Sequence, residues 1–182
     1  MNIPMSNKIK LILGPMFASK STYLLAEERR SKAAKKKVVC VKHSFDTRYT
    51  SGTEIATHNK EYSSSPSFST HSLMTIVEQL KEYDVILIDE GQFFEDLLPT
   101  VDYLLAQGKY IVVAGLSSDY QKNLFKPIAD LIPKADQIIH AQAICTKCGS
   151  DAPFTSRIIS QEGQTLVGGS ESYEPRCRSC YS

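Results

Sequence analysis

Near its start the chain has a short apolar segment, a loop of nine residues and then a charged, amphipathic segment. The apolar residues at 8–13 predict a buried strand, and the residues from Lys20 onward predict a helix. The loop between them reads Gly14-Pro15-Met16-Phe17-Ala18-Ser19-Lys20-Ser21-Thr22. A strand that passes through such a loop into a helix restricts the fold strongly, because it specifies an α/β unit.

The loop has the form of a phosphate-binding loop, G-x-x-x-x-G-K-S, with Ser19 where that motif has its second glycine. In such loops the backbone N–H groups and the helix N-terminus bind phosphate oxygens, so all nine residues are candidates for contact with ATP. Lys20 is expected to reach the β- and γ-phosphates, and the Ser21 hydroxyl to ligate Mg²⁺. A side chain at Ser19 is expected to crowd the phosphate or strain the turn. The alternative is a chance turn before a helix.

Further apolar, β-branched runs follow along the chain. Short and nearly continuous runs of this kind are typical of strands buried on both faces of a parallel sheet. They span residues 38–42, 85–88 and 110–114, and a further strand is predicted at 137–143. The predicted fold class is α/β: a P-loop NTPase-type parallel sheet flanked by helices.

Segments with helical spacing of apolar residues lie between these runs. In the helix predicted at 20–35, Tyr23, Leu24 and Leu25 are expected on the buried side, with charged residues elsewhere. Gly108 is expected to end the helix predicted at 94–107. The stretch 45–70 is too long for a plain connector, which predicts a functional loop or a small hairpin. The helical segments are 20–35, 72–81 and 94–107.

Composition and charge exclude several classes of protein. The 182 residues are 42% hydrophobic and 23% charged, which is typical of a globular domain. A net charge of +1 argues against non-specific binding to nucleic acid or to a membrane surface. The basic run at 29–37 is interpreted as the solvated end of the first helix. The apolar runs are too short to span a bilayer, and residues 1–10 lack an apolar signal segment, so we expect a cytoplasmic protein with neither nucleic-acid nor membrane partners.

Two acidic residues, Asp89 and Glu90, follow directly on the apolar run 85–88. An acidic residue at this strand end is the partner that a phosphate loop needs, so Asp89 is expected to hold Mg²⁺, directly or through water. Glu90 can orient or deprotonate a nucleophile, which is water in an ATPase and a substrate hydroxyl in a kinase. These residues by themselves are compatible with both an ATPase and a kinase. The Asn-Lys-x-Asp and Asp-x-x-Gly motifs of GTPases are absent.

Four of the five cysteines form two Cys-x-x-Cys pairs. Four thiolates suit tetrahedral Zn²⁺ in a closed, structural site, and disulfides are the less favoured alternative in a reducing compartment. The ligands would be Cys145, Cys148, Cys177 and Cys180. We therefore predict a P-loop nucleotide-binding domain at 1–143 and a small zinc-binding β module, a lasso, at 144–182. The fifth cysteine, Cys40, is interpreted as a small core residue.

Taken in order, these motifs resemble those of the cytosolic, zinc-containing type II thymidine kinase family over almost the whole chain. The resemblance rests on the phosphate loop, Asp46-Thr47-Arg48-Tyr49, Asp89-Glu90-Gly91-Gln92-Phe93-Phe94, the two cysteine pairs, and Val167-Gly168-Gly169 followed by Tyr173. It implies ATP-dependent phosphorylation of the 5′-hydroxyl of thymidine, and of deoxyuridine, in nucleotide salvage for DNA synthesis.

The resemblance also implies roles for individual residues. Glu90 matches the family's general base, and Arg48 a residue near the transferring phosphoryl group. Ser21, Asp89 and Asp46 match the magnesium ligands or their water shell. The residues that match the nucleoside pocket are Met16, Phe93, Leu116, Tyr120, Phe125, Thr155, Leu166, Val167, Gly168 and Tyr173. Core packing is an equal alternative for Phe125, and the family has phenylalanine more often where this chain has Tyr120.

The resemblance further implies a homotetramer and feedback binding of thymidine triphosphate (dTTP). Two other hypotheses compete with a nucleoside kinase. One is a small ATPase in which Glu90 activates water. The other is a zinc-ribbon interaction module whose nucleotide site only switches its shape.

Overall fold

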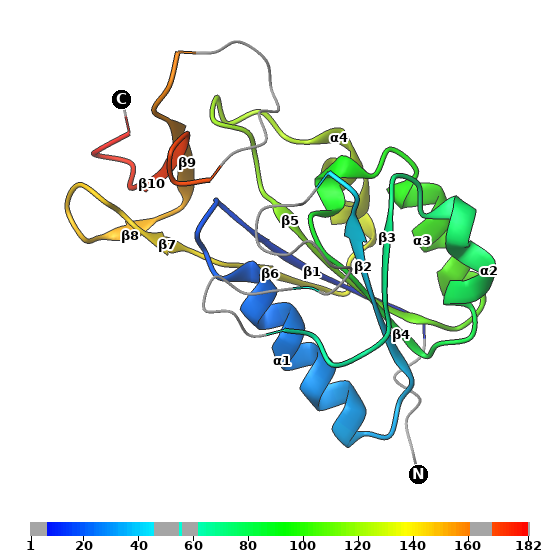
Figure 1. Cartoon of the computed structure of the whole chain (residues 1–182). Coiled ribbons are helices and arrows are strands. Elements are labelled where there is room, and N and C mark those ends of the chain that lie inside the picture. The colour runs from blue at the N-terminus through cyan, green and yellow to red at the C-terminus, as the bar shows by residue number, and fades with distance from the viewer. Residues whose placement is uncertain (1–6, 46–54, 56–61, 161–168, 182) are drawn as a thin grey trace.

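The computed structural model describes residues 7–45, 55, 62–160 and 169–181. Six strands form one sheet in the order β3-β2-β4-β5-β1-β6, and all neighbouring pairs are parallel (Figure 1). The strands are β1 (Lys8–Gly14), β2 (Val38–His43), β3 (Ser67–Thr70), β4 (Val85–Ile88), β5 (Tyr110–Leu116) and β6 (Gln137–His140). The predicted α/β class with a parallel sheet is confirmed.

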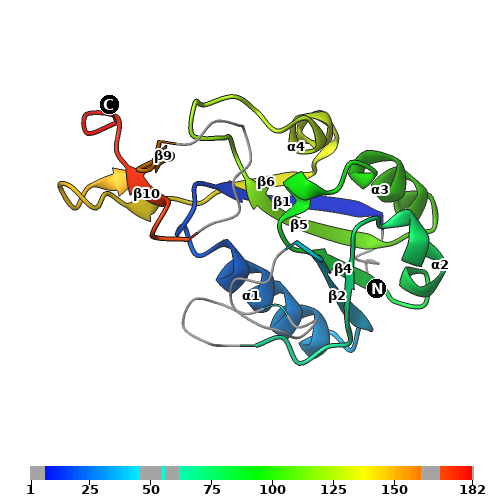
Figure 2. The ribbon, with the colours of Figure 1, turned by 45° about the horizontal axis from the view of Figure 1, so that its top comes forward.

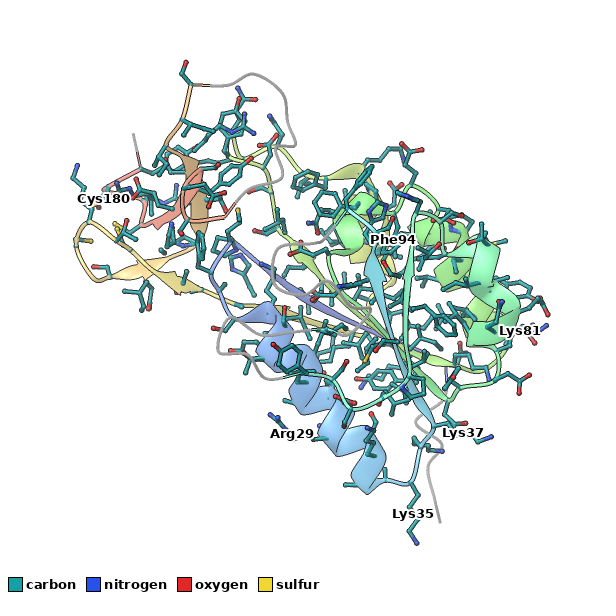
Figure 3. All side chains as sticks on the ribbon, in the orientation of Figure 1. Arg29, Lys35, Lys37, Lys81, Phe94 and Cys180 are labelled. Atoms are coloured by element: carbon teal, nitrogen blue, oxygen red, sulfur yellow. The ribbon has the colours of Figure 1, made fainter. Side chains whose placement is uncertain are left out.

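Helices cover both faces of the sheet: α1 lies on one face, and α3 and α4 lie on the other (Figure 2). Successive residues of a strand point to opposite faces, so Leu11 and Leu13 of β1 pack under α3 and α4 while Ile12 packs under α1. Phe94 is fully buried in the first of these two cores (Figure 3). The helices are α1 (Lys20–Ala33), α2 (Val77–Leu80), α3 (Leu97–Ala106) and α4 (Lys126–Leu131), with 3₁₀ turns at Met74–Ile76, Gly91–Phe93 and Ile132–Lys134.

The buried face of α1 differs from the prediction. Tyr23 is 42% exposed, whereas the charged side chain of Glu27 is buried. The Glu27 carboxylate pairs with the Lys10 ammonium at 2.5 Å and accepts a hydrogen bond from the Tyr110 hydroxyl at 3.2 Å. Because these partners satisfy its charge, Glu27 can lie on the helical stripe that faces the sheet. The basic run behaves as predicted, since Arg29, Lys35 and Lys37 project into solvent (Figure 3).

The last residues of the stretch 45–70 form β3, a strand that was not predicted. Residues 46–54 and 56–61 lie outside the described residues, so the functional loop or small hairpin expected there stays a prediction. Strand β3 pairs in parallel with β2 at the edge of the main sheet, and is therefore not half of a hairpin with it. Its residues are mostly polar and partly exposed, so the strand carries no apolar run. The predicted helix 72–81 is reduced to a 3₁₀ turn followed by the short helix α2. The helix α4, which has a proline in its first turn, was not predicted.

Residues 144–160 and 169–181, here called the C-terminal module, lie beyond the end of β1 that enters the phosphate loop (Figure 1). The module contains two small antiparallel pairs of strands. The first strand of the first pair begins at Ala143, one residue before the module. The pairs are β7 (Ala143–Ile144) with β8 (Asp151–Ala152), and β9 (Phe154–Arg157) with β10 (Tyr173–Arg176). Across the described part of the chain, every helix is too short or too polar to cross a lipid bilayer.

Candidate active site

The loop at 14–22 leaves β1 through a glycine that the packing requires. A Cβ atom on Gly14 would lie 2.5 Å from the carbonyl oxygen of Ala141, which is far inside van der Waals contact. Further along, Phe17 and Ser19 have positive φ angles of 65° and 55°. Left-handed backbone costs about 1–2 kcal/mol in a residue other than glycine, so the turn is strained at Ser19, as the departure from the motif led us to expect.

The Lys20 side chain folds back over this loop. It is 7% exposed, and its ammonium donates a hydrogen bond to the carbonyl oxygen of Pro15 at 2.8 Å. Next along α1, the Ser21 hydroxyl donates to Oδ2 of Asp89 at 3.0 Å. The structure thus brings the loop against the carboxyl end of β4, although 68 residues separate Ser21 from Asp89.

Glu90 lies directly after Asp89, with a left-handed φ of 51°. Gln92, which is buried, donates from Nε2 to Oε2 of Glu90 at 2.5 Å and accepts from the N–H of Leu116 at 3.0 Å. Gln92 therefore connects the Glu90 carboxylate to the end of β5. A Cβ atom on Gly115 would lie 2.9 Å from Oε1 of Gln92, so a larger residue there would require the Gln92 amide to shift. Sequence reasoning gave Gln92 no role; its position two residues after the acidic pair was the available signal.

The residues predicted to bind a nucleoside come from both parts of the molecule. The N–H of Met16 donates to Oγ1 of Thr155 at 3.0 Å, which joins the phosphate loop to β9. Tyr120 and Tyr173 both contact Arg157, a residue that the sequence analysis did not single out.

Two further aromatic candidates differ in burial. Phe93 is partly exposed, with its ring centroid 5.7 Å from that of His43. Phe125 is buried and belongs to the core under α3 and α4, so core packing accounts for it. The remaining candidates lie outside the described residues: Asp46, Arg48, Leu166, Val167 and Gly168.

A cavity of about 420 Å³ is lined mainly by the C-terminal module. Phe17 lines it from the loop, while Ile158, Tyr173 and Pro175 line it from the module. A residue of the phosphate loop and a predicted nucleoside-binding residue therefore border the same space.

Four sulfur atoms gather in the C-terminal module, as the cysteine spacing predicted (Figure 3, near Cys180). The Sγ atoms of Cys145, Cys148, Cys177 and Cys180 lie within 4.8 Å of one another, and none forms a disulfide. Ligands 2.3 Å from a tetrahedral zinc ion are roughly 3.8 Å apart, so the cluster fits Zn²⁺. Hydrogen bonding from the backbone, that of Cys177 first, lowers the pKa of Cys145 to about 6, whereas hydrogen bonds with Cys148 and Cys177 raise the pKa of Cys180 to about 12. The thiols therefore share protons with one another, and binding of a metal would release them.

Cys40 lies apart from this cluster. It is fully buried on β2, and burial raises the pKa of its thiol to about 12. The interpretation of Cys40 as a core residue is confirmed.

Comparison with known proteins gives this geometry its context. A family model described as thymidine kinase matches residues 7–181. The chain belongs to the thymidine kinase family. The thymidine kinase of Raccoon poxvirus is 38% identical over 173 residues, covering 95% of this chain and 96% of the viral protein. Thymidine kinase 1 of Dictyostelium discoideum is 37% identical over 180 residues, covering 97% of this chain and 78% of that protein.

Thymidine kinases of other poxviruses give similar values: that of Variola virus is 37% identical over 173 residues. Among solved structures, a DNA replication initiation factor aligns with 74% of this chain and 40% of its own, at a TM-score of 0.44 and 15% identity, which is too distant to inform function. Membership of the thymidine kinase family confirms the resemblance found in the motifs and makes the chain an enzyme of the kinase class. The interaction-module hypothesis is set aside, and ATP is implied as the phosphoryl donor.

Proposed function

We propose that the protein transfers the γ-phosphoryl group of ATP to the 5′-hydroxyl of thymidine. The observation that supports this most directly is the hydrogen bond between Ser21 and Asp89, which places the phosphate loop against the acidic end of β4. In open α/β sheets ligands bind outside the carboxyl ends of the strands, where Glu90 also lies. The choice of thymidine as the substrate rests on membership of the thymidine kinase family.

The Ser21 and Asp89 oxygens suit a magnesium ion. Mg²⁺ prefers oxygen ligands, and neighbouring ligands of an octahedral ion lie roughly 3.0 Å apart. The Ser21 hydroxyl and Oδ2 of Asp89 are 3.0 Å apart, so they fit adjacent positions or the water shell of such an ion. Asp46 is proposed as a further ligand. When bound, the ion would neutralise charge on the β- and γ-phosphates.

In this proposal Glu90 is the general base. Its carboxylate takes the proton of the 5′-hydroxyl as the bond from O5′ to the γ-phosphorus forms and the bond from that phosphorus to the β-phosphate oxygen breaks, releasing ADP. Gln92 holds Oε2 of Glu90 and so fixes the direction of the carboxylate. Lys20 holds the phosphates, and Arg48 is proposed to stabilise charge on the transferring group.

The nucleoside would lie between the sheet and the C-terminal module. The contact of Met16 with Thr155 supports this placement. We propose that Leu166, Val167 and Gly168 cover the base and that Phe93 and Leu116 line its other side. Deoxyuridine, which lacks only the base methyl group, is proposed as a second substrate.

Several wider properties complete the proposal on family grounds. We propose zinc as the structural metal of the four cysteines, dTTP as a feedback inhibitor at the same site, a homotetrameric assembly and a cytoplasmic location. We also propose the division into a nucleotide-binding domain at 1–143 and a zinc-binding lasso at 144–182.

Replacing Glu90 by glutamine tests the reaction. We expect Glu90→Gln to bind ATP and thymidine but to lose about 10²–10⁴-fold in turnover, because a positioned base contributes that much. Glu95→Gln is the matched control, since Glu95 is exposed five residues away in the same segment. The measurement is ADP formation in the presence of thymidine and, separately, of each nucleoside of a panel. Unchanged turnover would refute the base, and ADP formation that ignores every nucleoside would point to an ATPase.

A further inference from the structure

The loop between β5 and α4, residues 117–125, is closed by its own hydrogen bonds. Asp119 is 4% exposed, and its Oδ1 accepts from the backbone N–H groups of Gln121 and Asn123, each at 2.8 Å. The N–H of Asp119 in turn donates to the carbonyl oxygen of Asn123 at 2.9 Å. Tyr120 therefore projects from a backbone that is locally fixed, and its ring remains to be positioned by other residues.

Arg157, on β9 of the C-terminal module, contacts that ring. The central carbon of its guanidinium lies 3.8 Å from the centroid of the Tyr120 ring. Its Nη2 donates to the hydroxyl of Tyr173 at 2.8 Å, across the β9–β10 pair. A planar guanidinium can stack on an aromatic face and donate within its own plane at the same time, which an ammonium cannot. One side chain thus joins two rings from segments far apart in sequence.

A second contact links the module to the same loop. The Tyr181 hydroxyl donates to the carbonyl oxygen of Tyr120. The ammonium of Lys122 lies 3.8 Å from the centroid of the Tyr181 ring. Tyr120 is therefore held at its backbone by Tyr181 and at its ring by Arg157, both from the C-terminal module.

We propose that Arg157 is a positioning residue for the nucleoside, which holds the Tyr120 ring in place as one wall of the nucleoside site. This inference rests on the proposed function and on the family resemblance, which implies that Tyr120 and Tyr173 belong to the nucleoside pocket. A ring that is already fixed need not be ordered when the nucleoside binds, so binding costs less free energy. Arg157 contacts the rings of Tyr120 and Tyr173, whereas the proposed phosphoryl transfer takes place at Glu90. Its loss should therefore affect the KM for thymidine more than kcat.

The test compares two arginines of the same module. Arg157→Met keeps the aliphatic stem and removes the guanidinium; we expect the KM for thymidine to rise about tenfold, with kcat and the KM for ATP within about twofold. Arg157→Lys should not restore affinity, because it keeps the charge but not the plane. The matched control is Arg176→Met, since Arg176 pairs with Glu174 on its own strand.

A readout besides activity is the mobility of the Tyr120 ring, followed by NMR relaxation of isotope-labelled tyrosine. We expect a more mobile ring in Arg157→Met than in Arg176→Met, with equal zinc content and equal thermal unfolding midpoints. Equal ring mobility or an equal KM in the two variants would overturn the inference, and so would a lower KM in Arg157→Met, which would show that Arg157 obstructs the base. An unaltered enzyme that phosphorylates no nucleoside would refute the proposed function, and this inference with it.

Discussion

The parallel sheet and the C-terminal module are stabilised by different means. Strands β1, β2, β4 and β5 are buried on both faces, and their large aliphatic side chains fill two cores. Among the described residues, the buried cluster beside the module consists of alanines and cysteines (Ala18, Ala141, Ala143, Cys145, Ala152 and Cys177), with Phe17 and Cys180 packed against it. Because hydrophobic stabilisation grows with buried apolar area, small side chains provide little of it, and we expect the module to depend on a metal ion held by its four cysteines.

This difference matters because the weaker region makes contacts at the proposed nucleoside site. Thr155, Arg157 and Tyr181 reach from the module to the phosphate loop and to the loop after β5. Glu90, by contrast, is held by Gln92 against the end of β5, and Ser21 lies at the start of α1, which packs on the sheet. We therefore expect nucleoside binding to depend on the metal and phosphate binding to depend on the hydrophobic core.

The largest expected effect separates the two regions by removing the metal. Cys177→Ser should lose zinc and with it the ordered module, since structural zinc provides about 10–16 kcal/mol in small zinc-binding peptides. We expect thymidine affinity and activity to be lost, while hydrogen–deuterium exchange of the β1, β4 and β5 peptides changes little. Cys40→Ala, in the sheet, is the control and should retain zinc. Normal thymidine affinity in a zinc-free variant would contradict a role for the module in the pocket.

The converse experiment weakens the sheet alone. Phe94 is fully buried, so Phe94→Ala should lower the free energy of unfolding of the sheet region by about 3–5 kcal/mol through the cavity it leaves. Urea denaturation measures this loss, and zinc stoichiometry should stay unchanged. Phe45→Ala is the control, because Phe45 is 57% exposed. If Phe94→Ala also releases zinc under native conditions, the two regions are not independent.

A smaller effect is expected from a polar contact within the sheet region. Burial raises the pKa of Glu28, but hydrogen bonds from Ser65, Lys32 and Ser64 outweigh burial and hold that pKa below its ordinary value of 4.5. Glu28→Gln should therefore cost about 1–3 kcal/mol at neutral pH. Because the native pKa is lowered, the stabilisation is complete above about pH 5 and is lost as the pH falls through the native value.

The stability difference between the unaltered protein and Glu28→Gln should accordingly narrow in acid. Urea denaturation at pH 7 and at pH 3.5 measures it, with Glu82→Gln, an exposed position, as the control. A difference that stays constant over this range would mean that the charge of Glu28 does not contribute.

The smallest effect concerns strain in the phosphate loop. Ser19→Gly relieves left-handed backbone but adds freedom to the unfolded chain, so we expect a net stabilisation of about 0.5–1 kcal/mol. ATP binding should persist in both proteins. Ser19→Ala removes the hydroxyl and keeps the strain, so it should not be stabilising. Thermal unfolding and ATP titration provide the measurements; absence of ATP binding by the unaltered protein would refute the assignment of the loop.

Much of the fold followed from local patterns in the sequence. Continuous apolar runs predicted β1, β2, β4 and β5, since strands buried on both faces must be apolar throughout. The strand β3 was missed because an edge strand can be polar, and its place depends on pairing with β2. The burial of Glu27 was missed for a similar reason, because its partners Lys10 and Tyr110 lie on other elements.

The sequence by itself determined the chemical groups of the candidate site: the phosphate loop, the acidic pair at Asp89 and Glu90, and the two cysteine pairs. Each is a short motif whose spacing already specifies its geometry. Only the tertiary structure decided how these groups meet, with Ser21 on Asp89, Gln92 between Glu90 and β5, and Arg157 on a ring contributed by another loop. Such contacts depend on how sheet, helices and module pack together, and a hydrophobic pattern reports that a residue is buried without reporting which residue it faces.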